Sequence, residues 1–222
     1  GRHRWRKADF IPWGLEPPFE NLYPQKIESL YLRSGYFRRI TDDKAEQIAG
    51  DGLHFDGKEA AACRRFFQTL GLTQSAIEQM AFDLALYNGM AMEVIWNRAH
   101  TQVVHLQPMK LSRVRAAKPA DTGAGGYYYS NDWRVVNQSG RILNGKYAAY
   151  TPTHYPAYAT DDNSGRQLLY AYKYSPVTDY YPLPDAESVY EELSLGADVT
   201  AFQRRYVENG MVSSAIVYVP FV

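Results

Sequence analysis

Cysteine is almost absent from this chain of 222 residues, which contains only Cys63. A disulfide within these residues is therefore excluded, and a reducing compartment is favoured. Cys63 falls in an apolar helical pattern, so we expect a small core residue rather than a nucleophile. No apolar run approaches the roughly 20 residues that a membrane helix needs, and no apolar segment follows the basic start. We expect a protein without a membrane span or a secretory signal.

An excess of positive charge is also absent, because 24 basic residues balance 24 acidic ones. Proteins that grip nucleic acid along a groove usually carry a basic excess. The composition therefore argues against tight nucleic-acid binding, although it would suit a channel through which DNA slides without sticking. The basic segment Gly1–Lys7 fits a solvated tail better than a nucleic-acid contact.

Sequence motifs for catalysis and for metal binding are missing. Neither Gly57-Lys58-Glu59 nor Gly145-Lys146-Tyr147 ends in the Ser or Thr that completes a phosphate-binding loop. The histidines match no metal-ligand spacing, and Asp161-Asp162 fits a solvated turn better than a calcium loop. We expect no enzyme, no cofactor and no metal site, since an active site would have to be assembled from residues distant in sequence.

Tyrosine, in contrast, is abundant, with 19 copies against 9 of Phe and 4 of Trp. Its large ring and polar tip suit half-buried sheets and protein interfaces. The run Tyr127–Tyr129 could stack on nucleobases, but Arg134 is its only nearby basic residue, so packing within a strand is favoured. Both a β-rich domain with wet sheet faces and an assembly protein with large interfaces remain open.

Helical spacing dominates the first half of the chain and strand-like alternation the second. We expect four helices, over 25–34, over 41–48 with Thr41 as N-cap, over 58–70, and from Thr73 or Ser75 to Asn88-Gly89. We expect strands over 90–96 and 101–107 as a hairpin, and over 111–116, 127–130, 133–137, 146–150 and 169–174, with an irregular loop over 151–165.

The last fifty residues have the clearest organisation. Prolines at 176, 182 and 184 end the sheet, and Asp185 is the expected N-cap of a helix that runs to Asn209. Gly196 predicts a break or kink in the middle of this helix. An apolar strand is expected over 215–219. The apolar residues predicted to share one face of the helix are Val189, Leu193, Val199, Phe202 and Tyr206.

Three blocks of this sequence resemble tailed-phage portal proteins. The first is Ala49-Gly50-Asp51-Gly52-Leu53, and the second runs from Tyr87-Asn88-Gly89 through the hairpin to Leu106-Gln107-Pro108. The third is Tyr174–Pro184 with the helix ending at Glu208-Asn209-Gly210. The chain departs from many members of the family after this point, where it has Val212-Ser213-Ser214 instead of an early proline.

The resemblance implies an α+β fold in which N-terminal helices pack on an antiparallel sheet, followed by a stem-like helix and a terminal strand. It divides the chain into an extended arm (1–24), a wing-like domain (25–184), a stem-like helix (185–210) and the start of a clip-like region (211–222). Portal proteins continue beyond this point, so the resemblance also implies a chain cut short at its C-terminus.

The function that the resemblance implies is structural. A portal forms a ring, which the resemblance implies to have twelve subunits, at one vertex of the virion capsid. Double-stranded DNA is packaged and ejected through the ring. The terminase large subunit docks on it, as do head-completion, scaffold or capsid proteins, and assembly takes place in the host cytoplasm.

The candidate residues for ring contacts or for the channel lie on the stem-like helix. They are Val189, Leu193, Val199, Phe202, Arg204, Arg205, Tyr206, Asn209 and Gly210. The alternative interpretation is a monomeric α+β binding module that uses a tyrosine-rich sheet to bind nucleic acid or a protein partner. A ring under the microscope would support the first interpretation, and salt-sensitive binding by an isolated monomer would support the second.

Overall fold

The computed structural model describes residues 10–14, 21–118, 125–136, 151–158 and 164–209. Its α-helices are α1 (Tyr23–Arg33), α2 (Gly35–Ala49), α3 (Ala60–Thr69), α4 (Gln74–Tyr87) and α5 (Tyr190–Glu208). Its strands are β1 (Gly89–Trp96), β2 (Val103–Met109), β3 (Val114–Ala116), β4 (Gly126–Tyr129), β5 (Thr153–Pro156) and β6 (Arg166–Tyr172). Short 3₁₀ turns are η1 (Leu111–Arg113), η2 (Trp133–Val135) and η4 (Asp185–Val189). The predicted α+β class is confirmed.

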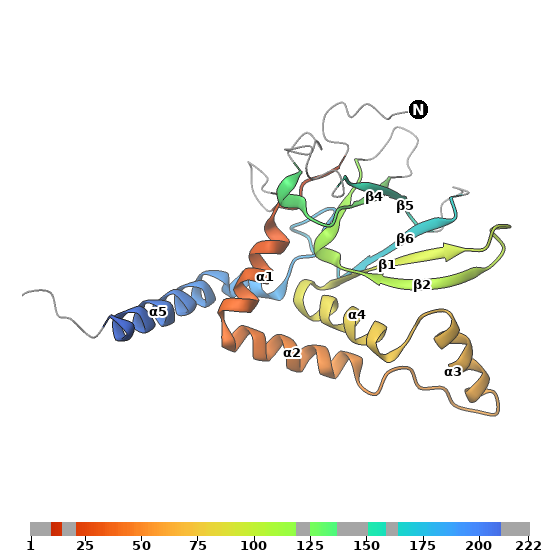
Figure 1. Cartoon of the computed structure of the whole chain (residues 1–222), viewed down its shortest axis with the longest axis horizontal. Helices are drawn as coiled ribbons and strands as arrows, with labels where there is room; N and C mark the ends of the chain where they lie inside the picture. Colours follow the sequence, from red (N-terminus) through yellow and green to blue (C-terminus); the bar gives the residue numbers. More distant parts are fainter. Residues whose placement is uncertain (1–9, 15–20, 119–124, 137–150, 159–163, 210–222) are drawn as a thin grey trace, which may run out of the picture.

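The larger sheet has the order β2-β1-β6 and lies on α4, with α2 beneath that helix (Figure 1). Strand β1 is antiparallel to both neighbours, and Glu93 at its centre faces Gln107 on one side and Leu168 on the other. The hairpin of β1 and β2 is the one that the sequence predicts. The pairing of β1 with β6 joins segments that lie more than seventy residues apart, as the Trp96–Gln167 hydrogen bond shows with its separation of 71 residues.

The outer edge of β2 is partly covered. The amide of Leu106 points away from β1 and donates to the carbonyl of Leu70 in the turn before α4, with an N···O distance of 2.6 Å. Pro108 has the same parity and therefore presents no N–H at this edge. These two devices leave little of the strand able to pair with a foreign strand.

The start of α2 differs from the prediction. The N-cap is Ser34, whose hydroxyl accepts from the Phe37 amide at 3.3 Å. Thr41 lies inside the helix, buried, and donates to the Phe37 carbonyl at 2.9 Å. Ser34 therefore satisfies the first-turn amides before Thr41 is reached. Helix α4 follows the prediction, because Thr73 caps it and Asn88 ends it in the left-handed conformation with φ of 61°.

Helix α3 lies at the end of the molecule opposite α5 and buries none of its residues (Figure 1). Cys63 is exposed on it, so the prediction of a core cysteine is wrong. The apolar residues of this helix contact nearby rings instead of the main core. Phe67 stacks on Phe55 with centroids 5.2 Å apart, and it meets Phe66 edge-on at 5.7 Å.

The smaller sheet has the order β3-β4-β5. The predicted strand over 111–116 begins with the turn η1, and the predicted strand over 133–137 is the turn η2, where the Asp132 side chain accepts from the Arg134 amide at 2.9 Å. The expected irregular loop over 151–165 contains β5, which pairs with β4 and buries Tyr155. The strand expected over 146–150 lies outside the described residues.

A fully buried arginine, Arg115, ties the N-terminal segment to the smaller sheet, and we call its surroundings the Arg115 clasp. The guanidinium lies over the rings of Trp13 and Trp133, 5.6 and 4.9 Å from their centroids. It donates to the carbonyls of Ser112, Val114 and Asn21 at 2.6–2.8 Å. Burial lowers the pKa of the Arg115 guanidinium to about 10, so the group remains charged at neutral pH.

Tyr181 closes the clasp from the C-terminal side. Its ring stacks on Trp13 with centroids 4.6 Å apart. Its hydroxyl donates to the Ile11 carbonyl and accepts from the Ala116 amide at 2.9 Å. Segments from both ends of the described chain therefore meet in the centre of the body.

No helix among the described residues is long and apolar enough to span a bilayer.

Candidate functional site

Helix α5 leaves the body and projects beyond it as an extended arm (Figure 1). Its root is the turn η4, where the Asp185 carboxylate collects contacts from three elements. Lys44 of α2 donates at 2.8 Å, Asn88 after α4 donates at 2.6 Å, and the Lys173 ammonium lies 3.9 Å away. Asp185 is therefore an anchor for the whole helix rather than the N-cap that the sequence predicted.

The charge of this anchor is secured by its partners. Partial burial raises the pKa of the Asp185 carboxyl, but the hydrogen bonds from Lys44 and Asn88 and the charges of both lysines outweigh it, and the net shift is downward. The carboxylate is therefore ionised at neutral pH, which is the state that all three partners favour.

Two further contacts hold the first turns of α5 against α1. The Tyr23 hydroxyl donates to Glu187 at 2.6 Å, and burial together with this carboxylate raises the pKa of the phenol, which stays a donor. The Arg33 guanidinium reaches Asp198 at 3.1 Å and Ser194 at 3.4 Å. Leu193 packs against the main core from the same side.

Beyond these contacts α5 is uncovered. From Leu195 to Asn209 only Ala197 is even partly buried, and every residue after Asp198 is exposed. Four exposed apolar residues follow one another at spacings of four, three and four, and on a helix of 3.6 residues per turn they lie within an arc of roughly 60°. We call them the apolar stripe, and they are Leu195 (66% exposed), Val199 (46%), Phe202 (69%) and Tyr206 (46%).

The apolar stripe faces away from the body. Leu193 lies roughly opposite it around the helix axis, so the expectation that Leu193 shares a face with Val199 is corrected. The helix runs without interruption through Gly196, so the predicted break is absent. No atom lies within 4 Å of the position that a Cβ would take at this glycine. Spacings of four and three are typical of a seam that packs against a second helix.

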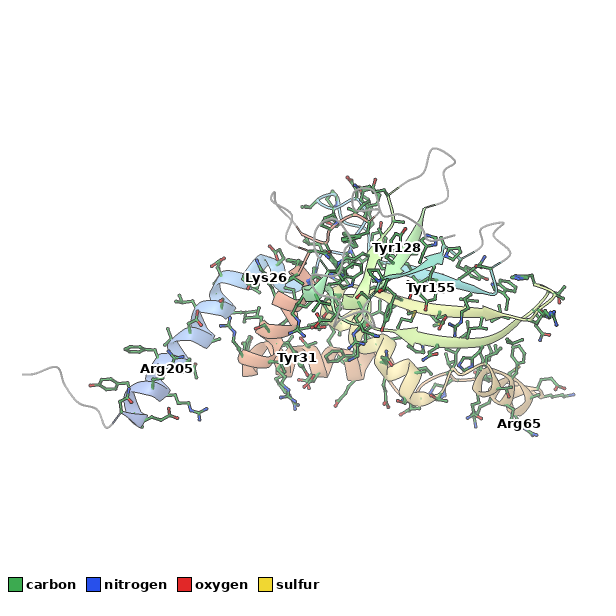
Figure 2. The ribbon with its side chains drawn as sticks, turned by 45° about the horizontal axis from the view of Figure 1, so that its top comes forward. Lys26, Tyr31, Arg65, Tyr128, Tyr155 and Arg205 are labelled. Atoms are coloured by element: carbon green, nitrogen blue, oxygen red, sulfur yellow. The ribbon has the colours of Figure 1, made fainter. Side chains whose placement is uncertain are left out.

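The other predicted contact residues are distributed around this stripe. Val189 belongs to η4 and is 44% exposed. Arg204 forms an ion pair with Glu208 at 2.7 Å, and Arg205 lies on the same projecting part (Figure 2). Asn209 is exposed at the end of the helix, and Gly210 lies outside the described residues.

Sequence analysis missed Leu195 and the anchoring role of Asp185. A four-three-four spacing of apolar residues begins at Leu195 and could have indicated it. The sequence prediction instead began the face at Val189 and placed Leu193 on it. The contacts of Asp185 come from residues 97 and 141 positions away, Asn88 and Lys44. No local pattern could have indicated them.

A hollow of about 420 Å³ lies beside the root of α5. Tyr174, Pro176, Leu183 and Pro184 form its apolar wall, and Asp185 lies on its edge. Tyr174 is 82% exposed at its rim. The junction thus presents concave apolar surface next to an ionised carboxylate.

The tyrosines of the strands are largely used for packing. The ring of Tyr127 stacks on Tyr170 with centroids 4.9 Å apart, and Tyr155 is buried. The most exposed tyrosines instead lie on the connector to η4 and on α2, at Tyr174 and Tyr36. This arrangement gives the alternative of a base-stacking sheet no support. Over the described part of the chain, no cluster of His, Cys, Asp or Glu has the arrangement of a metal site.

Comparison with known proteins finds similarity in structure but not in sequence. No protein-family model matches the chain, and no curated protein sequence matches it. A chain in the neck of a native gene transfer agent (GTA) particle, computed with C12 symmetry, superposes with a TM-score of 0.58 at 14% identity. That match covers 97% of this chain and 49% of the other.

Two further solved structures agree with this one. A chain of the virion of a native GTA particle gives a TM-score of 0.56 at 15% identity, covering 88% of this chain and 47% of that one. A chain from the neck of an empty GTA particle, computed with C6 symmetry, gives 0.55 at 12% identity, covering 88% and 48%. The chain therefore spans about half the length of the solved chains it matches. Its fold is one that GTA neck and virion particles contain.

Proposed function

We propose that this chain is the wing and stem of a portal-type ring subunit in a phage, prophage or related particle, with a structural rather than an enzymatic role. The observation that carries the proposal is α5. Its root contacts the body through Asp185, Glu187 and Arg33, yet its apolar stripe is uncovered. A projecting helix with an apolar side in solvent is suited to pack against another molecule.

A ring of identical copies is the partner that best fits this helix. The matched chains come from necks computed with C12 and C6 symmetry, which supports a cyclic assembly. In a cyclic ring each subunit uses two different surfaces, and the contact closes when the rotation per subunit is correct. The apolar stripe of one α5 then packs on the adjacent copy, so that the helices together surround a central opening. Twelve copies fit the C12 structure.

Passage of double-stranded DNA through that opening is the next part of the proposal. The chain is neutral overall, with 24 basic and 24 acidic residues. A lining without a basic excess lets DNA slide where a basic lining would bind it. Docking of the terminase large subunit, contacts with head-completion and scaffold or capsid proteins, and a place in the virion follow from the portal resemblance.

The experiment is to measure the mass of the purified chain in solution and to image it by negative-stain microscopy. The expected particle is a ring with a central hole and a mass of twelve chains of 25.3 kDa each. Phe202→Ser, in the middle of the apolar stripe, should dissociate the ring because it removes the most exposed apolar side chain of that seam. A wild-type chain that remains monomeric at every concentration would contradict the proposal.

A further inference from the structure

A basic surface lies at the corner between α1 and α2, and we call residues 32–40 the basic corner. Arg33, Arg38 and Arg39 lie in this stretch, which contains no acidic residue. Their side chains are 46%, 60% and 79% exposed. Leu32 and Tyr36 beside them are each 73% exposed. The corner is therefore cationic and apolar at once.

An acidic surface lies at the start of the projecting helix, and we call residues 185–192 the acidic root. Asp185, Glu187, Glu191 and Glu192 lie in this stretch, which contains no basic residue. Glu191 and Glu192 are exposed. Around the helix axis they lie on either side of Leu195, the residue at the N-terminal end of the apolar stripe. The acidic root therefore continues the uncovered side of α5.

Within one copy these two surfaces do not neutralise each other. Arg38 and Arg39 pair with Asp42 and Asp43 of their own helix, at 3.7 and 3.0 Å. Among the residues that the structure describes, neither Glu191 nor Glu192 has an ion-pair partner. Exposed pairs one helical turn apart contribute little and exchange partners readily. The charges of Arg38, Arg39, Glu191 and Glu192 are thus available to another molecule.

We propose that the basic corner of one copy docks on the outward side of the acidic root of the next copy. The inference rests on the proposed ring and identifies the surfaces that join its subunits. Arg38 and Arg39 face Glu191 and Glu192 in this contact, with Leu32 and Tyr36 meeting Leu195 between them. The two surfaces differ from each other, as a head-to-tail contact in a ring requires.

The position of the corner within its own copy supports this pairing. Arg33 ties the corner to Asp198 of the same chain, so each corner lies beside the root of its own α5. When the apolar stripe of one copy packs along the adjacent helix, its acidic root is brought to the adjacent corner. One docking geometry therefore covers both the stripe and the root, and complementary charge sets the direction of the contact.

Charge reversal tests the pairing. The corner variant is Arg38→Glu with Arg39→Glu, and the root variant is Glu191→Lys with Glu192→Lys. Each creates like charges across the proposed contact, and we expect the apparent dissociation constant for assembly to rise by about tenfold or more. The matched control is Arg64→Glu with Arg65→Glu, an equally adjacent and exposed pair on α3 at the far end of the molecule (Figure 2). This control should assemble like the wild type.

Mixing the two variants gives the decisive measurement, read as particle mass by mass photometry. The reversed, acidic corner of one variant fits the reversed, basic root of the other. The normal corner of the second variant likewise fits the normal root of the first. Equal amounts of the two should therefore assemble together although neither assembles alone, with the copies alternating around an even-numbered ring. Because restored assembly requires both proteins to be folded, rescue also excludes misfolding as the cause of the single defects.

Every other outcome counts against a defined part of the inference. If the wild type forms rings and both variants do so equally well, the docking contact is wrong and the portal proposal stands. If the single variants fail and the mixture also fails, the corner and the root do not pair with each other. If the wild type never assembles, the docking contact and the proposed function fall together.

Discussion

The Arg115 clasp and helix α5 use charged and aromatic side chains in opposite ways. In the clasp, the Arg115 guanidinium is buried between Trp13 and Trp133 and satisfied by backbone carbonyls. On α5, Phe202 is 69% exposed and Arg204 pairs with Glu208 one turn away. The clasp packs within one copy, whereas the apolar stripe of α5 has no packing partner among the described residues. In the proposed ring, the clasp would serve folding and the exposed side of α5 would serve assembly.

The largest effect should come from breaking the clasp. Arg115→Met leaves the carbonyls of Ser112, Val114 and Asn21 buried without their donor, and we expect a loss of about 3–5 kcal/mol in the free energy of unfolding. Urea unfolding followed by tryptophan fluorescence measures it. Arg113→Met is the control and should cost about 1 kcal/mol or less, because the guanidinium hydrogen-bonds to Tyr129 and Asn131 near the surface. Equal losses would refute the special role of the clasp.

The body also contains one group that opposes its stability. Asp83 is buried and accepts from the Leu111 amide at 2.9 Å. Burial raises the pKa of its carboxyl to about 7; the hydrogen bond from Leu111 opposes this rise and the nearby Glu28 adds to it. In the unfolded chain the pKa of this carboxyl is near its ordinary value of 3.8.

The sign of the pH dependence follows from these two pKa values. Between about pH 4 and pH 7 the folded state holds the proton and the unfolded state does not, so stability falls as pH rises through this window. Asp83→Asn, which keeps an acceptor for Leu111, should flatten that fall. It should be more stable than the wild type above pH 7, by up to about 4 kcal/mol. Unfolding curves at pH 4.5 and 8 measure the difference, and an unchanged slope would contradict the assignment.

A smaller, local effect is expected at Gly196. The helix passes through this residue in a regular conformation, and no atom would meet an added methyl group. Gly196→Ala should therefore stabilise α5 by roughly 0.5–1 kcal/mol. Amide hydrogen exchange along α5 reports it, with Ala201→Gly as the control of opposite sign. If exchange at the Arg115 clasp slowed as well, the two regions would not be as independent as the comparison holds.

The smallest effect on folding, and the sharpest form of the comparison, concerns Phe202. In dilute, unassembled protein, Phe202→Ser should change the free energy of unfolding by less than about 0.5 kcal/mol, because the phenyl side chain of Phe202 is exposed to solvent. Leu168→Ala, at a fully buried position of β6, should cost about 2–5 kcal/mol in the same assay. When assembly of the subunit ring is measured instead, Phe202→Ser should have the larger effect of the two substitutions. A Phe202 variant that loses stability as a monomer would show that α5 folds back on its own body.

What could be predicted from the sequence follows the distinction between local and distant causes. The hairpin after Asn88 is predicted from the sequence, and the start of α4 is predicted at Thr73 or Ser75, of which the structure has Thr73, since turn chemistry and capping act over a few residues. The N-cap of α2 was misplaced because Ser34 competes with Thr41, and both are good caps. Trp133 is predicted to lie in a strand. The Arg134 amide instead donates a hydrogen bond to the Asp132 carboxylate, and the backbone turns there.

The candidate site was only half predictable for the same reason. The helical period located α5 and most of its exposed residues, but the period alone does not say which face meets the body. That choice is made by Arg33 and Tyr23, whose partners are 165 and 164 residues away. Cys63 shows the converse, because an apolar helical pattern on α3 did not lead to burial.

The joining of the two ends of the chain has a consequence for the order of events during synthesis. Tyr181 closes the clasp on Ile11 across 170 residues, and Glu187 meets Tyr23 across 164. At ribosomal rates of 5–20 residues per second, the N-terminal helices wait roughly 10–30 s for these partners. The contacts that complete the body belong to the same short stretch that begins α5. In the proposed ring, α5 could therefore not reach a neighbour before its own body is able to close, and the timing of assembly would be coupled to the end of folding.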